Sequence, residues 1–246
     1  MHHRLSGLAL AAAFMLAFAP PARATIEEGY APGGSPVPST WYRRADPAAL
    51  AADRDYVRGM RQHHAGALTM SEAYLAEPAA RSPALRRLAV AIIRNQRFEI
   101  ALLDEVGRNL DRPPLRLGGL ALQPMATEGL AQMARFQRSP IPGGIAFGPV
   151  SEADVVFAKA MILHHRGALA MVRDYRAASG TGPAANGFLG LVNVDIVTDQ
   201  TQEIALMRRV IAAWPGDAEA VAVPPGMVHG MPGMAAGPSS PGHHHH

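Results

Sequence analysis

The chain has 246 residues, an apolar content of 48% and a formal net charge of +3. Its basic residues are scattered arginines plus the single Lys159, without interleaved aromatic residues, which argues against nucleic-acid binding. Because cysteine is absent, disulfides, covalent c-type haem attachment and a lipid-anchored leader are excluded. Nothing resembles a Ser/His/Asp nucleophile arrangement, so we expect a non-catalytic protein.

Residues 1–24 have the pattern of a secretory signal peptide. Arg4 precedes an apolar run from Leu8 to Ala19, and Ala22-Arg23-Ala24 is a small-x-small cleavage site. A short membrane anchor is the alternative, but no stop-transfer pattern follows. We therefore expect a periplasmic or extracellular protein, cleaved near Ala24 and free of the membrane afterwards, with a net charge of +1 once Arg4 and Arg23 are lost.

Residues 25–45 are rich in Pro, Gly and Ser and are predicted to be a flexible linker. Asp46-Pro47 then provides an N-cap and a first-turn proline for a helix that ends before Pro78. Ser82-Pro83 repeats this start signal for a second helix, which runs to about Asn109. Residues 46–110 are thus predicted to form a helical hairpin.

Residues 111–150 are predicted to be a long crossover with a short helix from about Thr127 to Phe136. Ser151 and Asp154 resemble a capping box for a third helix, and a fourth runs from about Ala184 to Trp214. No segment shows the period-two alternation of a strand. The prediction is an all-α, ferritin-like four-helix bundle over 46–214, made of two repeated helical hairpins (46–110 and 151–214), and a disordered tail over 215–246.

A double-histidine segment occurs twice, at a constant offset of 101 residues. Eight of the fifteen positions from Met60 to Tyr74 match their counterparts. At about 100° per residue, two imidazoles and two thioethers share one face of each helix. The candidate metal ligands are Met60, His63, His64, Met70, Met161, His164, His165 and Met171.

The second helix of each predicted hairpin carries Gln-x-x-Glu-Ile level with the histidines, because residues equidistant from the turn of an antiparallel hairpin lie at the same height. The polar side chains at this level are Gln96, Glu99, Asp199, Gln200 and Glu203. They are either alternative metal ligands or residues that orient an imidazole. A purely structural pairing of the two glutamates with Arg61, Arg166 or histidine is an equal alternative. Which histidine of each pair faces the site is not determined by the sequence.

Imidazole suits copper, zinc, iron and nickel, whereas thioether sulfur selects Cu(I). In an exported chain, methionine offers a soft donor that does not oxidise to a disulfide. The expected cofactor is therefore copper, with zinc and iron as lesser candidates. Weaker candidate ligands are Met125, Met227, His229, Met231 and Met234; the terminal His243–His246 are either native or a purification tag.

The His-His-x-Gly-Ala-x-x-Met segment, the paired Gln-x-x-Glu-Ile and the crossover Gln123-Pro124-Met125 resemble the exported bacterial family called domain of unknown function 305, over roughly residues 50–214. The resemblance implies a ferritin-like bundle and an association with copper binding and copper tolerance, through the eight ligands named above. Family members often have a methionine-rich run in the crossover, of which this chain keeps only Met125. Met231-Pro-Gly-Met234 in the tail is a partial replacement for that run.

The leading functional hypothesis is sequestration, buffering or transfer of copper, with other copper-handling proteins as possible partners and an undetermined oligomeric state. A ferritin-like redox or storage site is the second hypothesis, but Glu-x-x-His is absent, since Met60, Arg61, Met161 and Ile162 stand three residues before the histidines. The third is a metal-free structural bundle whose histidines sense pH between about 5 and 7.

Overall fold

The computed structural model describes residues 39–128, 147–179 and 185–228. Within them the chain forms four long helices, α1 (Pro47–Ala76), α2 (Pro83–Leu110), α4 (Glu152–Ala178) and α5 (Gly187–Ala212). A small sheet comprises β1 (Ser39–Arg44), β2 (Leu115–Leu117) and β3 (Leu120–Glu128), and a 3-10 turn, η1, spans Pro225–Val228. The signal peptide, most of the predicted linker and the end of the tail lie outside the described residues.

Each helix begins at a side chain that caps its first turn. Asp46 accepts a 2.8 Å hydrogen bond from Ala49 N, and Ser82 and Asn186 cap α2 and α5 in the same way. Ser151 and Asp154 form the predicted capping box at α4. The predicted helix starts are therefore confirmed at α1, α2 and α4, whereas α5 begins three residues later than expected.

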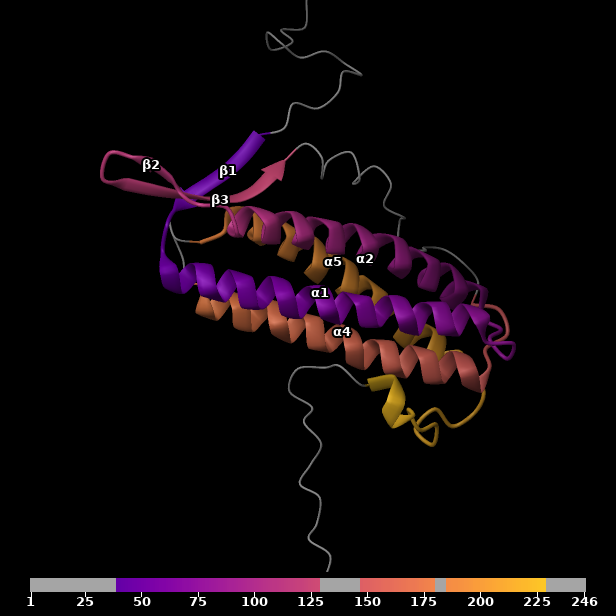
Figure 1. Ribbon diagram of the computed structural model, residues 1–246. Helices are drawn as coiled ribbons and strands as arrows, with labels where there is room; N and C mark the ends of the chain where they lie inside the picture. Colours follow the sequence, from indigo (N-terminus) through magenta and orange to yellow (C-terminus); the bar gives the residue numbers. More distant parts are fainter. Residues whose placement is uncertain (1–38, 129–146, 180–184, 229–246) are drawn as a thin grey trace, which may run out of the picture. The chain divides into compact units, whose positions relative to one another are not determined.

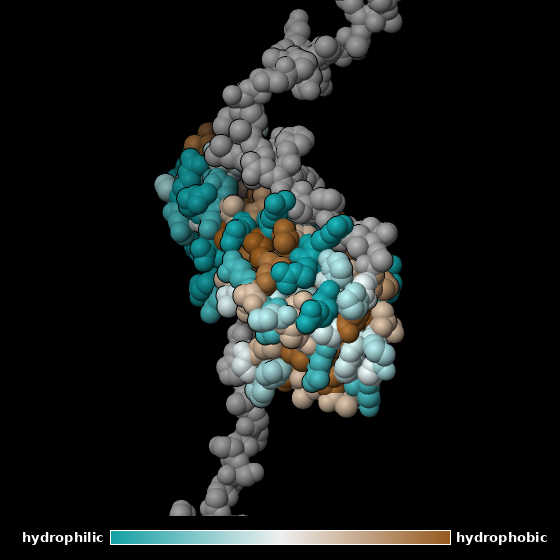
Figure 2. All heavy atoms as spheres, turned by 90° about the vertical axis from the view of Figure 1, so that its right-hand side faces the viewer, coloured by the Kyte–Doolittle hydropathy of each residue, from teal (hydrophilic) through white to brown (hydrophobic). Residues whose placement is uncertain are grey.

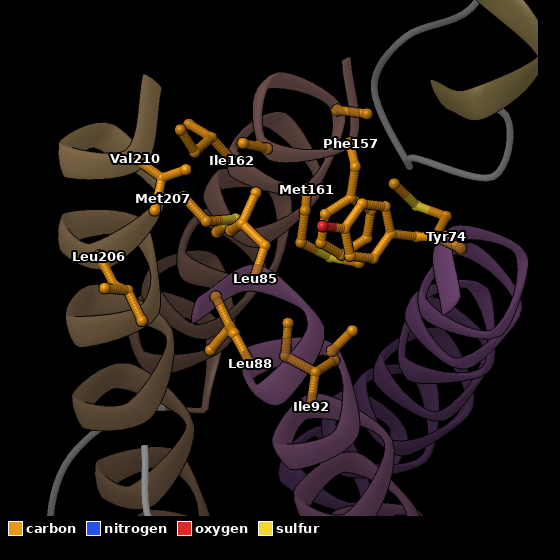
Figure 3. Close-up of a cluster of buried hydrophobic side chains, with 14 of the residues drawn as sticks. Tyr74, Leu85, Leu88, Ile92, Phe157, Met161, Ile162, Leu206, Met207 and Val210 are labelled. Atoms are coloured by element: carbon orange, nitrogen blue, oxygen red, sulfur yellow. The ribbon is translucent and has the colours of Figure 1, made fainter. Parts of the chain in front are cut away.

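The four helices pack side by side, with α1 against α2 and α4, and α5 against α2 and α4 (Figure 1). Two hydrophobic clusters fill the interior. The first includes Tyr74, Leu85, Leu88, Phe157 and Met161, and Figure 3 shows their side chains meeting between the helices. The second lies around Tyr56, Leu103, Tyr175 and Ile196.

The interior is covered on the side viewed in Figure 2, where small hydrophobic areas are set among hydrophilic residues. Of the described helices, α4 has the length and hydropathy of a membrane span, but 56% of its most apolar window is buried inside the protein. That burial is what a core helix of a packed protein shows.

The expectation of a chain without strands is wrong. β3 pairs antiparallel with both β1 and β2, so part of the predicted linker and part of the predicted crossover form a sheet (Figure 1). Residues 123–126 of β3 are buried one after another and β2 is exposed throughout. Neither strand alternates between buried and exposed residues, which is why the sequence lacks the period-two hydrophobic pattern of a strand. The predicted helix from Thr127 is also wrong at its start, and its remainder lies outside the described residues.

Pro124 fits in β3 because of where β2 stops. β2 pairs only with Leu120 to Leu122, so at Pro124 the strand has β1 alone as neighbour, and the β1 register shifts there between Trp41 and Tyr42. Proline is tolerated at such edges and bulges. The adjacent Gln123 donates through Nε2 to the carbonyls of Asn109, Leu110 and Arg112, which satisfies the C-terminal end of α2.

The segment after α5 returns to α4. Lys159 Nζ donates to the carbonyl oxygens of Ala218 (2.8 Å) and Val221 (2.7 Å), and the Val221 side chain is buried. The described part of the predicted disordered tail is therefore held against the helices.

Candidate functional site

The two histidine pairs meet where α1 crosses α4. His63 and His64 come from α1, His164 and His165 from α4, and all four side chains are buried. They lie midway between the two hydrophobic clusters, since Met60 belongs to one cluster and Met161 to the other. A buried polar centre thus interrupts an apolar interior.

His63 and His164 are in ring contact. Their centroids are 3.7 Å apart with planes inclined by 38°. Gly66 makes this approach possible, because a Cβ there would lie 3.2 Å from His164 Nε2, closer than most side chains come. Glycine weakens a helix relative to alanine, and this close approach explains why one stands at this position.

His64 and His165 instead face the second helix of their own hairpin. His165 Nε2 lies 2.6 Å from Glu203 Oε2 with hydrogen-bond geometry. His64 Nε2 lies 2.8 Å from Glu99 Oε2, at ion-pair distance but outside hydrogen-bond geometry. The predicted height of the glutamates is confirmed. Arg61 pairs with Asp104 at the surface, so it is not the partner of Glu99.

Burial keeps the imidazoles neutral. It lowers the pKa of His63 to about 3, of His164 to about 2 and of His165 to about 3, and repulsion from the neighbouring histidines contributes to each of these values. A buried cation loses its hydration, and at His165 the nearby Glu99 offsets that loss only in part. At neutral pH these three rings therefore carry lone pairs and no charge.

Several buried polar atoms at this centre have no hydrogen-bond partner. They are both ring nitrogens of His63 and His64, Nδ1 of His164 and His165, and both amide atoms of Gln96 and Gln200. Asp199 is half-buried one residue before Gln200. Most buried polar groups in native proteins are paired with protein, water or a bound ligand, so this set indicates a place where something polar binds.

The candidate methionines lie in the hydrophobic clusters to either side. Met70 and Met161 are in the first cluster, while Met60 is in the second and Met171 packs against it. The terminal methyl of Met171 reaches α1, since a Cβ at Gly59 would lie 3.1 Å from it. Met161 lies beside Phe157 and Tyr74 in Figure 3. These thioethers flank the histidines along the helices and also serve as packing side chains.

The weaker candidates lie apart from the four histidines along the chain. Met125 is buried in β3, in the sheet that packs on α2. Met227 lines a cavity of about 370 Å³ together with Tyr74, Glu77 and Glu152. His229, Met231, Met234 and the terminal histidines lie outside the described residues.

Asp53 was missed in the sequence and Asp154 was predicted only as a capping residue, although both are buried hydrogen-bond acceptors. Asp154 Oδ1 accepts from Tyr74 OH at 2.5 Å, and Asp53 Oδ1 accepts from Tyr175 OH at 2.8 Å. Asp53 also pairs with Arg43 of β1 and accepts from Asn186. Asp53 and Asp154 are separated by the same 101 residues as the histidines, so extending the repeat seven residues towards the N-terminus would have found them.

Among the described residues, no group of three or more His, Asp or Glu side chains is arranged to hold a metal ion. Any ion at this centre would draw on few imidazoles, with thioether or amide donors completing its ligands.

The family model for domain of unknown function 305 (DUF305) matches residues 53–211. The chain belongs to the DUF305 family. This confirms the resemblance drawn from the double-histidine and Gln-x-x-Glu segments, and the matched range holds both histidine pairs and both glutamates of the DUF305 chain. No curated protein and no solved structure matches it.

Proposed function

We propose that this DUF305 chain is an exported copper-binding protein that sequesters, buffers or transfers Cu(I). The proposed ligands are imidazoles of His63, His64, His164 and His165, supported by the flanking methionine sulfurs. Its four helices would form a ferritin-like bundle of two repeated hairpins. Other copper-handling proteins are the proposed partners.

The observation that carries the proposal is the set of partnerless buried atoms. Leaving a buried polar group unpaired costs about 1–3 kcal/mol, and the Nδ1 atoms of His64, His164 and His165 are all in this state. A metal ion is the ligand that neutral imidazole lone pairs bind best. These unpaired nitrogens support a metal ion held by one or two imidazoles at a time, since no three His, Asp or Glu side chains of the described residues are grouped around one point.

The donor types favour copper over zinc and iron. Zinc sites use four nitrogen, sulfur or oxygen ligands, and the described residues offer no group of three His or carboxylate side chains. Cu(I) accepts few ligands and prefers soft sulfur. Met60, Met70, Met161 and Met171 lie about one or two helical turns from the histidines on the same helices.

The repeated-hairpin organisation is supported by contacts that recur at the repeat offsets. His64 faces Glu99 as His165 faces Glu203. Tyr74 stacks on Phe157 as Tyr175 stacks on Tyr56, with centroids 4.0 Å and 4.2 Å apart. The His63–His164 contact lies between the two halves, which favours one shared centre over two separate ones.

The alternatives are less well supported. A pH sensor working between about 5 and 7 needs histidines that titrate there, but burial lowers the pKa of His63, His164 and His165 to about 2–3. A di-iron carboxylate site needs several glutamates beside histidines, and among the described residues no group of three or more His, Asp or Glu side chains could hold a metal ion.

The test is a copper titration of residues 25–242, which lack the leader and the terminal histidines, under reducing and then oxidising conditions. Competition with a chromogenic Cu(I) chelator would give the affinity. Replacing Met60, Met70, Met161 and Met171 together by Leu should weaken Cu(I) binding at least tenfold. Met207→Leu is the control, because Met207 is buried in the first cluster but lies on α5, outside the two double-histidine segments.

Unchanged Cu(I) affinity in the fourfold variant would remove the methionines from the proposal. Absence of copper binding in the parent chain would refute the function itself.

A further inference from the structure

The glutamate facing His165 contacts one of its two ring nitrogens, Nε2. Building on the proposed function, we infer that Glu203 is a positioning residue that fixes His165 as the Nε2–H tautomer, so that this ring presents its Nδ1 lone pair to the metal. Glu203 itself would not touch the ion.

The geometry at His165 gives the proton its place. Nε2 lies 2.6 Å from Glu203 Oε2 with hydrogen-bond geometry, and both side chains are buried. An ionised carboxylate can only accept hydrogen bonds, and a neutral imidazole has one N–H. With Glu203 as the acceptor of this hydrogen bond, the proton is on Nε2, which leaves Nδ1 unprotonated.

The other nitrogen is available. His165 Nδ1 is buried and no protein atom hydrogen-bonds to it. A buried acceptor without a donor is unfavourable in the metal-free protein and becomes favourable when a cation binds it. Carboxylate–histidine–metal arrangements of this kind are common, and the carboxylate raises the basicity of the ligating nitrogen.

The other half of the molecule has a similar pair without the hydrogen bond. His64 Nε2 is 2.8 Å from Glu99 Oε2, but neither ring nitrogen of His64 has a hydrogen-bond partner. The proposal therefore rests on His165. His63 and His164, whose rings contact each other, carry no part of it.

The experiment uses the full chain with His243–His246 replaced by alanine in every version. Long-range proton–nitrogen correlation of ¹⁵N-histidine-labelled, metal-free protein at neutral pH identifies the tautomer of each ring. His165 should show a protonated Nε2 and an unprotonated Nδ1. Anaerobic addition of Cu(I) should then shift Nδ1 of His165 and leave its Nε2–H in place.

The variants separate positioning from packing. Glu203→Leu removes the acceptor and should abolish the fixed tautomer and weaken Cu(I) binding by about 10–100-fold. Glu203→Gln keeps a carbonyl acceptor at the same place, so it should retain the tautomer and recover most of the affinity. Glu72→Gln, which disrupts an exposed pair with Arg97, is the control and should change neither.

The outcomes distinguish this inference from the proposed function. If Cu(I) binds but His165 carries its proton on Nδ1, or coordinates through Nε2, the inference is overturned and copper binding stands. If copper fails to bind, the proposed function and the coordination step both fall, whatever the tautomer. Should Glu203→Leu not fold, the wild-type tautomer and the Glu203→Gln affinity decide the matter.

Discussion

Tyr74 of α1 donates a hydrogen bond to Asp154 of α4, and Tyr175 of α4 donates the matching bond back to Asp53 of α1. Each aspartate also supports the start of a second helix. Asp154 accepts from the backbone N–H of Arg81 and Ser82, and Asp53 accepts from the amide of Asn186. The two hairpins are therefore joined by buried polar bonds on both sides of the histidines.

Removing one of these hydroxyls should destabilise the protein. Tyr74→Phe leaves buried Asp154 short of a donor, so the free energy of unfolding should fall by about 1–3 kcal/mol. Tyr175→Phe should have a similar effect. Tyr42→Phe, at an exposed position, should change it by less than about 0.5 kcal/mol. Urea denaturation measures all three, and equal effects at Tyr42 and Tyr74 would contradict the role of the hydrogen bond.

Adding a methyl group at Gly66 should push the His63–His164 contact apart. Alanine favours a helix over glycine by up to about 1 kcal/mol, but at Gly66 the new Cβ would meet His164 Nε2 at 3.2 Å. Overpacking of this kind costs about 1–3 kcal/mol, so Gly66→Ala should be neutral to destabilising.

Gly190→Ala on α5 is the matched control for Gly66→Ala. Nothing lies within 4 Å of its Cβ position, so this variant should be stabilised by up to about 1 kcal/mol. Equal melting-temperature gains for the two variants would show that the rings have room to move.

The buried histidines should make the metal-free protein acid-sensitive. The pKa values of His63, His164 and His165 fall from 6.5 in the unfolded chain to about 2–3 in the folded one. Between these values the unfolded chain binds more protons, so stability is fully present above pH 6.5 and is lost as the pH falls towards 3.

Each of these histidines contributes up to about 1.4 kcal/mol per pH unit within that window. Denaturant midpoints measured from pH 7.5 to 4 in the presence of a chelator would give the slope. His164→Gln should reduce it by about one proton. An unchanged slope in that variant would show that His164 is already protonated in the folded protein.

The sheet should depend on one buried ion pair. Arg43 of β1 and Asp53 of α1 lie 2.9 Å apart with almost no exposure, and truncating one partner of a buried pair costs about 3–5 kcal/mol. Arg43→Ala should therefore strongly lower the unfolding free energy. Arg97→Ala breaks an exposed pair with Glu72 and should cost at most about 1 kcal/mol. Comparable losses in the two variants would show that burial of the Arg43 pair adds nothing.

The helices and the level of the glutamates could be predicted from the sequence because both follow from local rules. Asp46, Ser82 and Ser151 are capping residues whose chemistry is independent of the rest of the chain. The contact between His165 and Glu203 follows from counting residues on either side of a turn. The close approach at Gly66 was likewise indicated by a helix-weakening residue kept in both repeats.

The sheet could not be predicted because its strands do not alternate between a solvent-exposed face and a buried face. Gln123 to Ala126 are buried on both sides, and Pro124 argues against a strand unless the end of β2 is known. Nor could the sequence separate the histidines by role. His63 and His64 differ by about 100° around the helix, and only the positions of α2 and α4 decide that His64 meets a carboxylate and His63 another ring.

The exchanged tyrosine bonds also define how the molecule could be divided. A break within residues 129–146 would leave each half with an aspartate whose tyrosine partner is on the other fragment. Asp53 would keep Arg43 and Asp154 would keep Ser151, but each carboxylate would lose its tyrosine donor, which the other fragment carries. The two fragments, made separately, should therefore assemble as a complementing pair. Two copies of one hairpin could form the equivalent tyrosine–aspartate hydrogen bonds with each other in a symmetric dimer.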